Sequence, residues 1–481
     1  MPGKQQAGAT TEHRGPLTGW GRTGPTVARI VRPTDIPGAT AALMGAGPRG
    51  TTARGLGRAY GDAAQNGGGL VLDATAIDFI GPIDPETGAV DVGGGTSLGA
   101  LITTAIAAGW FIPVTPGTRH VTIGGAIASD VHGKNHHVEG TFTQHVDSMT
   151  LLLPSGETRV VTPESDRALF WATAGGMGLT GVIVEARVRL TPAATRFITV
   201  DTYRTNDLDQ TMSLMADYDT RTHYSVAWID LVTAGAHMGR GVLTCGDHAP
   251  LEALEERKRE DARRWRPRPA PPAPPIFPSQ VVNRLTSRMF NELWFRKAPA
   301  ERLGELLPLE TFFYPLDIVD QWNRVYGPRG FLQWQCVIPF GEEARLRRLV
   351  EAFVHGPVPA TLAVLKRFGA ANPGHLSFPM PGWTLAVDLP AARGDELASF
   401  LDGLDREVAD GGGRIYLSKD ARMRPEWLDV MYPRIDEWRE VQARIDPQGR
   451  LTSDLDRRLG ITAPASARVR GAGPHSMGDA R

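Results

Sequence analysis

The first stretch able to do chemistry is residues 53–69, ARGLGRAYGDAAQNGGG, which hold six glycines and two arginines. Glycine is used where the backbone approaches something closely or adopts positive φ. Three more glycine-bearing stretches follow, at 92–98, 115–137 and 175–183. Several such loops predict a long, thin anionic ligand that backbone N–H groups contact at several points, and a dinucleotide with a pyrophosphate fits. The alternative for 53–69 is a plain surface loop in which Arg54 and Arg58 are unpaired.

None of these loops carries the pattern of two common nucleotide sites. The Gly-x-x-x-x-Gly-Lys-Ser/Thr pattern is absent from the sequence of all four, which disfavours a P-loop nucleotidase. No Gly-x-Gly-x-x-Gly stands in a strand–turn–helix context with an acidic residue ~20 positions later, which disfavours a Rossmann site.

A histidine cluster, HGKNHH, invites a metal interpretation. His132, His136 and His137 come with no cysteine and with Glu139 as the nearby carboxylate. That ligand set is poor for a metal ion, so no metal is predicted. Cys245 and Cys336, the two cysteines of the chain, lie far apart, which argues against a disulfide framework or a cysteine-based zinc site.

The composition limits the classes of protein. With 481 residues and 41% hydrophobic composition, the chain is expected to form a large core and two domains. A formal net charge of −1 gives no electrostatic basis for nucleic-acid binding. No apolar run approaches the ~18–20 residues of a membrane span, and the first residues lack a secretory core. We expect a cytoplasmic type of sequence, with disordered tails at 1–16 and 461–481.

The first half reads as short strands with a few helices. Strands are predicted in 26–32, 69–80 (strand, turn, strand), 89–95 and 180–192, a hairpin in 148–162 and short helices in 96–110 and 164–176. In the first of these helices, one face carries Leu98, Leu101, Ile102, Ala105 and Ile106, with Thr96 or Ser97 as N-cap.

The second half reads as longer strands alternating with amphipathic helices. Strands are expected in 224–234, 330–340, 360–369 and 382–390, and helices in 342–356 and 396–413. This pattern suits a sheet covered by helices. Residues 250–265 predict a charged helix, and the proline-rich 266–278 predicts an extended, mobile segment. An inert linker and an active-site lid are both open for that segment.

These motifs resemble a known family. ARGLGRAYGDAAQNGGG, PGTRHVTIGGAIASDVHGKNHH and GGMGLTGVI are similar to the flavin-binding loops of the vanillyl-alcohol-oxidase superfamily. The resemblance is closest to its decaprenylphosphoryl-β-D-ribose 2′-oxidases and covers about 17–460, helped by FNELWFRKAP, FFYPLD, FLQWQCVIPF, FPMPGW, RIYLSKDAR, MYPRIDEW and IDPQGRLTSDLDRRL. It implies an α+β flavoprotein of two domains. A PCMH-type FAD-binding domain (17–195, completed by 411–460) would flank a substrate domain with an antiparallel sheet (196–410).

The resemblance also implies the cofactor contacts. The residues that would line FAD are Ala53, Arg54, Gly55, Leu56, Gly57, Arg58, Ala59, Tyr60, Gly61, Asp62, Ala63, Gly117, Thr118, Thr122, Ile123, Gly124, Gly125, Ser129, Asp130, Val131, His132, Gly133, Ile183 and Tyr416. Many members of the superfamily tether the flavin through a histidine of the first loop. This chain has no histidine between His13 and His120, so we predict non-covalent FAD.

For catalysis the resemblance implies Lys419, His132 and Tyr60. Lys419 would lie at the flavin and the substrate, where a cation stabilises the charge that develops near flavin N1 and C2=O. The substrate-binding positions would be Lys134, Trp228, Tyr314, Gln333, Gln335, Lys366, Phe368, Thr384, Ala386 and Lys419. Without the resemblance, Lys419 would be a surface residue at a strand end and Lys366 the exposed face of an amphipathic strand.

The implied activity is oxidation of the 2′-hydroxyl of decaprenylphosphoryl-β-D-ribose to the 2′-keto lipid, the first half of an epimerisation that supplies cell-wall arabinan in actinobacteria. A partner short-chain NAD(P)H-dependent keto-reductase would complete it. The lipid substrate implies peripheral membrane contact, for which 246–300 is a candidate, and a periplasmic location stays open. The alternatives are a soluble FAD-dependent sugar-alcohol or aldonolactone oxidase that uses O₂, and a non-enzymatic flavin-binding protein.

Two pocket positions depart from the mycobacterial members. Ala386 replaces a cysteine and Thr384 replaces an asparagine. That cysteine is the residue modified by covalent nitroaromatic inhibitors, so this chain is predicted to form no such adduct. Hydride transfer does not need the thiol, so an oxidase activity is still expected.

Overall fold

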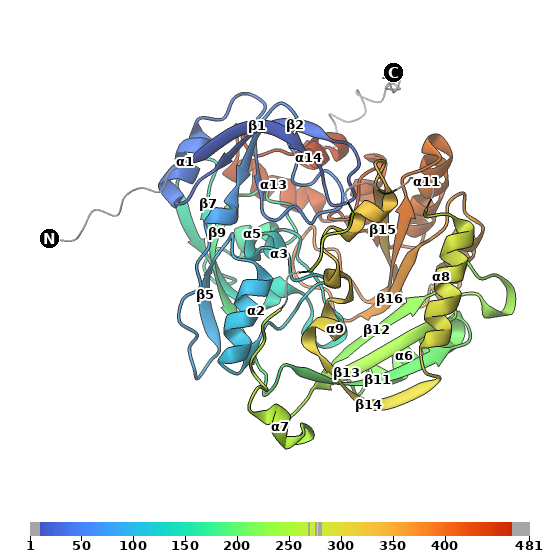
Figure 1. Ribbon diagram of the computed structural model, residues 1–481. Helices are drawn as coiled ribbons and strands as arrows, with labels where there is room; N and C mark the ends of the chain where they lie inside the picture. Colours follow the sequence, from blue (N-terminus) through green and yellow to red (C-terminus); the bar gives the residue numbers. More distant parts are fainter. Residues whose placement is uncertain (1–9, 268–269, 275–276, 278–280, 464–481) are drawn as a thin grey trace.

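The computed structural model describes residues 10–267, 270–274, 277 and 281–463 (Figure 1). It has the expected α+β architecture, in which two four-stranded sheets form the first half and an eight-stranded sheet the second. The outer parts of the predicted tails, 1–9 and 464–481, lie outside the described residues.

The first small sheet has the order β1-β2-β4-β3. Its strands are β1 (Thr11–Leu17), β2 (Thr26–Arg32), β4 (Leu70–Asp73) and β3 (Thr51–Arg54), and α1 (Ile36–Met44) packs on it through buried Ala39 and Leu43. The expectation of a disordered tail up to residue 16 was therefore wrong from Thr11 onward. Strand β1 pairs antiparallel with β2 along its whole length, although its side chains are mostly exposed. Its pairing with β2 depends mainly on backbone hydrogen bonds, so the sequence shows no apolar pattern that would predict a strand.

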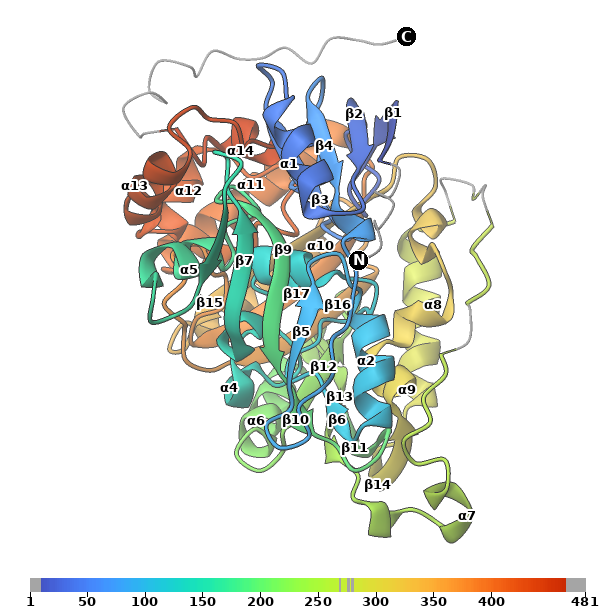
Figure 2. The same ribbon diagram turned by 90° about the vertical axis from the view of Figure 1, so that its left-hand side faces the viewer.

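The second small sheet has the order β5-β9-β7-β8 (Figure 2). Its strands are β5 (Ala89–Gly93), β9 (Val182–Arg189), β7 (Val146–Leu152) and β8 (Thr158–Val161), so the predicted hairpin is confirmed. Helix α2 (Leu98–Ala107) starts at the Ser97 N-cap and buries all five predicted apolar residues. The second strand predicted within 69–80 is reduced to one bridge, Ile80 to Val92. Short helices α3 (Ile123–Ala128), α4 (His136–Glu139) and α5 (Arg167–Thr173) and the strand pair β6 (Trp110–Phe111) and β10 (Thr191–Pro192) complete this half.

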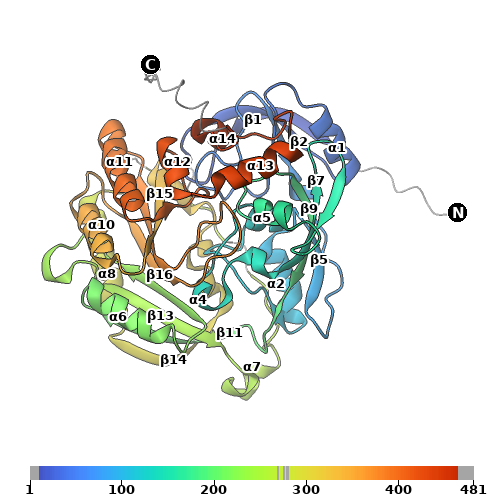
Figure 3. The same ribbon diagram turned by 180° about the vertical axis from the view of Figure 1, so that it is seen from behind.

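The large sheet is antiparallel throughout, in the order β14-β11-β13-β12-β16-β17-β15-β18. Its strands are β14 (Glu301–Pro308), β11 (Phe197–Thr205), β13 (Gly241–His248), β12 (Tyr224–Ile229), β16 (Leu362–Phe368), β17 (Gly382–Pro390), β15 (Phe331–Pro339) and β18 (Arg414–Ile415). Helices α6 (Leu208–Tyr218), α10 (Glu343–His355) and α11 (Gly394–Asp410) cover one face (Figure 3). The opposite face looks toward the first half, where Ser225 N donates to Lys134 O at 2.9 Å.

The C-terminal segment crosses back to the first half. Strand β18 still belongs to the large sheet, so the crossing begins after Ile415 rather than at 411. Helices α12 (Glu426–Met431), α13 (Ile435–Ile445) and α14 (Asp454–Leu459) follow, and Trp438 Nε1 donates to Ala172 O at 2.8 Å. Ile461 is fully buried, which corrects the prediction that disorder starts there.

The region from 250 to 300 differs most from expectation. The predicted charged helix is reduced to α7 (Glu256–Arg259), because Leu254 and Ala262 fold onto a small apolar cluster and Trp265 packs into the main core instead of following a helical face. Within the proline-rich stretch, Asp320 pairs with the backbone on both sides of Pro272, donating to Pro271 O (3.0 Å) and accepting from Ala273 N (2.8 Å). The predicted extended segment is therefore held by backbone hydrogen bonds at 271–273; residues 268–269, 275–276 and 278–280 lie outside the described residues. Helices α8 (Arg284–Lys297) and α9 (Leu309–Phe313) flank β14.

Candidate active site

The register of the large sheet gathers most of the predicted substrate residues on one face. Gln333 and Gln335 of β15 stand opposite Asp388 and Ala386 of β17. Thr384 of β17 stands opposite Lys366 of β16. Because successive side chains of a strand point to opposite faces, all of these side chains share a face, and the same alternation adds Phe368 and Trp228. This is the face turned toward the first half.

His132 lies at the centre of one hydrogen-bonded group. Gln335 Nε2 lies 3.1 Å from His132 Nε2 and 3.1 Å from Thr384 Oγ1, and the ring of Phe368 packs 4.7 Å from the imidazole. Burial, reinforced by the nearby Lys366 amine, holds the pKa of His132 well below its usual range, so the ring is neutral. Because Gln335 donates to Nε2, the ring proton is on Nδ1. That nitrogen is buried and has no partner in the described part of the chain.

Lys419 lies at the centre of a second group. Its Nζ lies 3.9 Å from the centroid of the Tyr60 ring. Burial lowers the pKa of Lys419 to about 7, although the Asp388 carboxylate opposes the shift. Burial also raises the pKa of Tyr60 well above 10, helped by the charge of Asp388, so the phenol keeps its proton. Gln333 Nε2 donates to Asp388 Oδ1 at 2.5 Å.

Two further amines, Lys134 and Lys366, are largely buried beside the His132 group. Lys134 Nζ donates to Phe312 O and lies 4.1 Å from the Phe312 ring centroid. Burial lowers its pKa to about 7, with a contribution from Lys366. Burial alone lowers the pKa of Lys366 to about 8, and among the described residues its Nζ has neither a hydrogen bond nor an ion pair. Such an arrangement is suited to an anion that supplies the missing negative charge.

The first glycine-rich loop packs against two other segments. A Cβ at Gly61 would collide with Asp420 O, and one at Gly55 with the Thr122 side chain. These glycines therefore allow the loops to approach one another. Within the described chain, the only backbone N–H between 56 and 64 that donates inside the protein is that of Tyr60, to Ser418 O at 2.9 Å. The remaining N–H groups are free to bind an anion, which fits the pyrophosphate of FAD.

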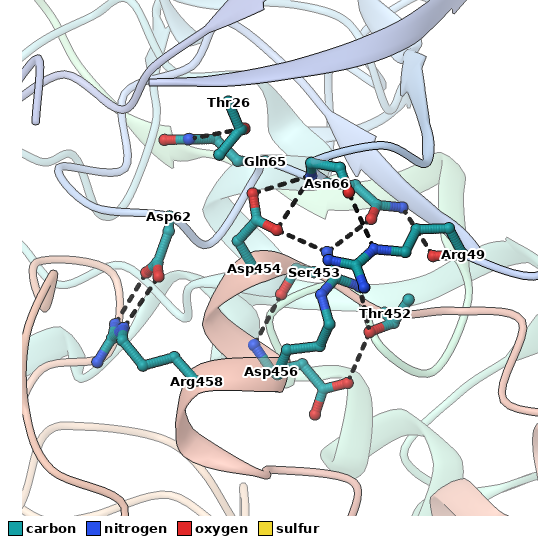
Figure 4. Close-up of polar contacts among 12 residues, drawn as sticks. Thr26, Arg49, Asp62, Gln65, Asn66, Thr452, Ser453, Asp454, Asp456 and Arg458 are labelled. Carbon is teal, nitrogen blue, oxygen red and sulfur yellow. Dashed lines mark hydrogen bonds and ion pairs between the residues drawn. The ribbon is translucent and has the colours of Figure 1, made fainter. Parts of the chain in front are cut away.

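The C-terminal segment holds this loop in place (Figure 4). Arg458 binds both carboxylate oxygens of Asp62, at 2.8 and 2.9 Å. One residue earlier, Arg457 donates to Asn66 Oδ1 at 2.7 Å, and the Asp454 carboxylate accepts from Gly67 N at 3.0 Å. Helix α14 thus fixes the far end of the loop predicted to bind the cofactor.

Several predicted cofactor residues have side chains that are engaged within the protein. Arg54 donates to Thr18 O and Ala64 O, and Thr118 donates to Asp317. Buried Asp130 accepts from Asn372 at 2.6 Å and from Ser377 at 2.5 Å. These three residues can contact a cofactor only through groups not used in these bonds, such as their backbones.

Other predicted residues position the loops around the site. Tyr416 OH donates to Ser129 O at 2.8 Å, and Tyr314 OH lies 2.7 Å from Thr115 Oγ1. Arg58 stacks on the Trp20 ring, 3.8 Å from its centroid, and its buried Nε has no partner among the described residues. The cofactor and substrate roles of the predicted residues stay predictions.

Sequence reasoning missed Asp388. It is 1% exposed and lies between Gln333 and the Lys419–Tyr60 pair. A signal was available, because Asp388 is the one charged residue of the otherwise apolar strand GWTLAVDLP. A lone charge on the inner face of a buried strand is a candidate functional group.

Comparison with known proteins identifies the family. Residues 28–162 match the family model described as FAD binding domain. The chain is 43% identical to the decaprenylphosphoryl-β-D-ribose oxidase of Mycolicibacterium smegmatis over 448 residues, which cover 92% of this chain and 97% of that protein. The chain belongs to the decaprenylphosphoryl-β-D-ribose oxidase family. It is an FAD-dependent oxidoreductase, as predicted.

Two other relatives are more distant or less informative. An uncharacterised protein of Streptomyces coelicolor is 40% identical over 70% of this chain and 92% of its own length. An L-gulono-1,4-lactone dehydrogenase of Mycobacterium tuberculosis is 23% identical over 89% of this chain and 95% of its own. None of the helices in the described ranges is both long and apolar enough to cross a bilayer.

Proposed function

We propose that this member of the family oxidises the 2′-hydroxyl group of a polyprenylphosphoryl-β-D-ribose to the 2′-keto lipid. The observation that supports this substrate most strongly is the pair of buried amines, Lys134 and Lys366, beside the His132 group. A phosphodiester would supply one negative charge to offset theirs, whereas a free polyol or lactone would leave their charge uncompensated. The relative at 43% identity is named for the same type of substrate.

The groups that would bind FAD are the donors of the site that have no hydrogen-bond partner within the described protein. The loop N–H groups between 56 and 64 would bind the pyrophosphate, and the unpartnered Nδ1 of His132 is a free donor for the cofactor. When bound, FAD accepts two electrons as a hydride equivalent from the alcohol carbon. Lys419 supplies positive charge next to Tyr60, whose phenol keeps its proton near neutral pH.

Anaerobic mixing of the FAD-loaded protein with farnesylphosphoryl-β-D-ribose tests the proposal. We expect the absorbance of the oxidised flavin to bleach in a single turnover. Free ribose and L-gulono-1,4-lactone serve as controls without a lipid phosphate. Bleaching by the lactone or by a free polyol, with none by the phospholipid sugar, would favour the soluble sugar-oxidase alternative. A short-chain NAD(P)H-dependent reductase added afterwards should convert the keto product to the arabinose epimer.

The lipid tail of this substrate calls for contact with a membrane surface, and α8 is the best candidate for it. The usual burial pattern of an amphipathic helix is reversed in α8. Its polar residues Ser287 and Asn291 are buried, and its apolar residues point outward. Those outward residues are Leu285 (69% exposed), Met289 (65%), Phe290 (55%), Leu293 (69%) and Trp294 (45%). An outward apolar stripe with Arg288 exposed beside it is typical of a helix that lies in a lipid interface.

Sedimentation with vesicles that contain an anionic phospholipid tests this role of α8. The full chain should sediment with the vesicles, and Leu293→Ser combined with Met289→Ser should abolish sedimentation while leaving flavin content unchanged. Val160→Ser, which removes an exposed apolar side chain of β8, is the matched control. Equal sedimentation of the double variant and the wild type would contradict the role.

A further inference from the structure

Asp388 is a buried carboxyl group with an unused oxygen. Its Oδ1 accepts from Gln333, and its Oδ2 is buried without a hydrogen-bond partner in the described part of the chain. Lys419 is near enough to influence it electrostatically, yet the described residues include no ion pair between the two. A buried carboxylate normally costs stability unless it is fully paired. An incompletely paired one among predicted catalytic residues therefore points to a function.

Three other polar groups of the site are unsuited to accept a proton. His132 accepts a hydrogen bond from Gln335 through its basic nitrogen, and its Nδ1 carries the proton. Tyr60 keeps its proton because burial raises the pKa of the phenol well above its usual value. Lys134 donates to Phe312 O. Asp388 Oδ2 is a buried oxygen that is free to accept a proton, and Lys419, whose pKa burial lowers to about 7, is the competing acceptor.

We propose that Asp388 Oδ2 is the general base that takes the proton of the substrate's 2′-hydroxyl group. This inference rests on the proposed function. In the step, the O–H bond breaks and its proton goes to Oδ2. The C2′–H bond breaks, its hydrogen passes with the electron pair as a hydride to oxidised FAD, and the C=O bond of the ketone forms. The alcohol loses two electrons, FAD is reduced, and Asp388 later releases the proton to solvent.

The surroundings of Asp388 suit this role. Gln333 fixes the carboxyl group from the neighbouring strand, and Ala386, the next residue on the same face, has only a methyl group. Lys419 and Tyr60, which come from the C-terminal segment and the first loop, both interact electrostatically with the Asp388 carboxylate. A hydroxyl group bound beside Asp388 would therefore have both an acceptor and a cation near it.

The titratable groups that face Asp388 are Lys419, Tyr60 and Tyr326. Burial raises the pKa of both tyrosines well above the usual value, so neither titrates near neutral pH. Burial raises the pKa of Asp388 itself to about 7, against the opposing effects of Gln333 and Lys419. A base whose pKa lies close to the working pH is the most effective proton acceptor. Lys419 titrates in the same range and has to be separated from Asp388 by experiment.

Anaerobic flavin reduction by farnesylphosphoryl-β-D-ribose, followed from pH 5.5 to 9 in Asp388→Asn, provides the first test. The variant keeps the size of the side chain and a partner for Gln333. We expect reduction to slow by about 10²–10⁴-fold, the range for a lost general base, with KM changed only a few-fold. The rise of the wild-type rate near pH 7 should disappear.

Asp405→Asn is the matched control, because burial also raises the pKa of Asp405 to about 7. Asp405 binds Trp334, which points to the opposite face of the large sheet. This variant should keep the pH profile of the wild type. Loss of the profile in Asp405→Asn as well, or its retention in Asp388→Asn, would overturn the assignment.

Two further measurements separate a base from a structural role. Added formate should restore at least tenfold of the lost rate in Asp388→Gly, because a small carboxylate can enter the vacated space; no rescue would overturn the proposal. Infrared titration of the FAD-loaded protein without substrate should show carboxyl C=O bands that titrate near pH 7. Asp388→Asn should lack one of them and Asp405→Asn another, and an unchanged spectrum of Asp388→Asn would also overturn the proposal. Failure of the wild-type flavin to bleach with the ribose lipid, although the Asp388 band is present, would show that the proposed substrate is wrong. That result would leave the assignment of the titrating carboxyl group to Asp388 intact.

Discussion

Replacing Lys366 by methionine should make the protein more stable and less able to recognise its substrate. Lys366 Nζ is largely buried on the inner face of the sheet and has no partner within the described residues. The folded state therefore bears the cost of a desolvated charge, which we infer is offset by the substrate's phosphate. Methionine has a similar length and no charge, so Lys366→Met removes the cost and the phosphate contact together.

The size of the effect follows from the pKa of Lys366, about 8 in the folded protein against an ordinary value of 10.5. The difference of about 2.5 pH units, at ~1.36 kcal/mol each, gives ~3.4 kcal/mol as an upper bound. The side chain retains some contact with solvent, so we expect about 1–3 kcal/mol. Lys134 adds to the gain, because Lys366 contributes to its lowered pKa and the variant relieves that repulsion.

The sign of the pH dependence is fixed by which state holds the proton. Between pH ~8 and 10.5 the unfolded chain keeps the Lys366 proton and the folded chain has released it, so wild-type stability rises with pH in this window. Below the window both states are charged and the wild type bears the full cost. The advantage of Lys366→Met should be greatest at pH 6–7.5 and disappear toward pH 10.5.

Urea unfolding of the FAD-loaded full chain at pH 6.5, 8, 9 and 10 measures this difference. Lys258→Met is the matched control, since Lys258 is half-exposed and pairs with Glu255; it should change stability by less than about 0.5 kcal/mol at every pH. In parallel, Lys366→Met should raise KM for farnesylphosphoryl-β-D-ribose with little change in kcat. A variant less stable than wild type at pH 6.5, or a difference independent of pH, would refute the reasoning.

Three more predictions follow from the site. Acid precipitation should release all yellow colour from the protein, because no histidine of the first loop is present to tether FAD; colour in the precipitate would show a covalent bond. Arg458→Ala should lower stability by about 1–3 kcal/mol and weaken FAD binding, measured by flavin fluorescence, because Asp62 loses its partner. Arg444→Ala, an exposed α13 residue, should change neither. Mass spectrometry after turnover with a covalent nitroaromatic inhibitor should find no adduct on the wild type and one on Ala386→Cys, and an adduct on the wild type would contradict the assignment of position 386.

The parts of the fold that sequence predicted well have a repeating pattern of burial. Helix α2 was readable because Leu98, Leu101 and Ile102 repeat with helical spacing and all are fully buried. Strands β15 and β17 were readable as apolar runs. Strand β1 and the stretch 250–265 were not. Backbone pairing holds most of β1, whose side chains are largely exposed, and the other stretch buries apolar residues that do not follow a helical repeat.

The candidate site was predictable as a set of residues but not as a geometry. Motifs pointed to Lys419, His132 and the two glutamines of β15, whereas the sheet register that puts Gln333 beside Asp388 is a property of paired strands. One sequence gives no information on which strand lies next to which. Asp388 was missed for this reason. The sequence shows a charged residue within an apolar strand but does not show which residues of other strands lie beside it.

The charges of the site explain why two halves of the chain are needed to build it. Lys134 and Lys419 come from the first half and the returning C-terminal segment, while Lys366 and Asp388 come from the large sheet. The site holds three largely buried amines and the Asp388 carboxylate, and the imidazoles of His132 and His136 are both held neutral. The pKa of His136 falls to about 3 through burial and the Lys366 amine. The protein alone therefore carries an excess of positive charge at this site. A substrate with one phosphodiester charge and a neutral sugar reduces that excess. Transfer of the hydroxyl proton would neutralise the Asp388 carboxylate, while the hydride would add one negative charge to the flavin, so the net charge of the occupied site would not change. The Lys419 cation, which interacts electrostatically with Asp388, would then stabilise the charge gained by the flavin.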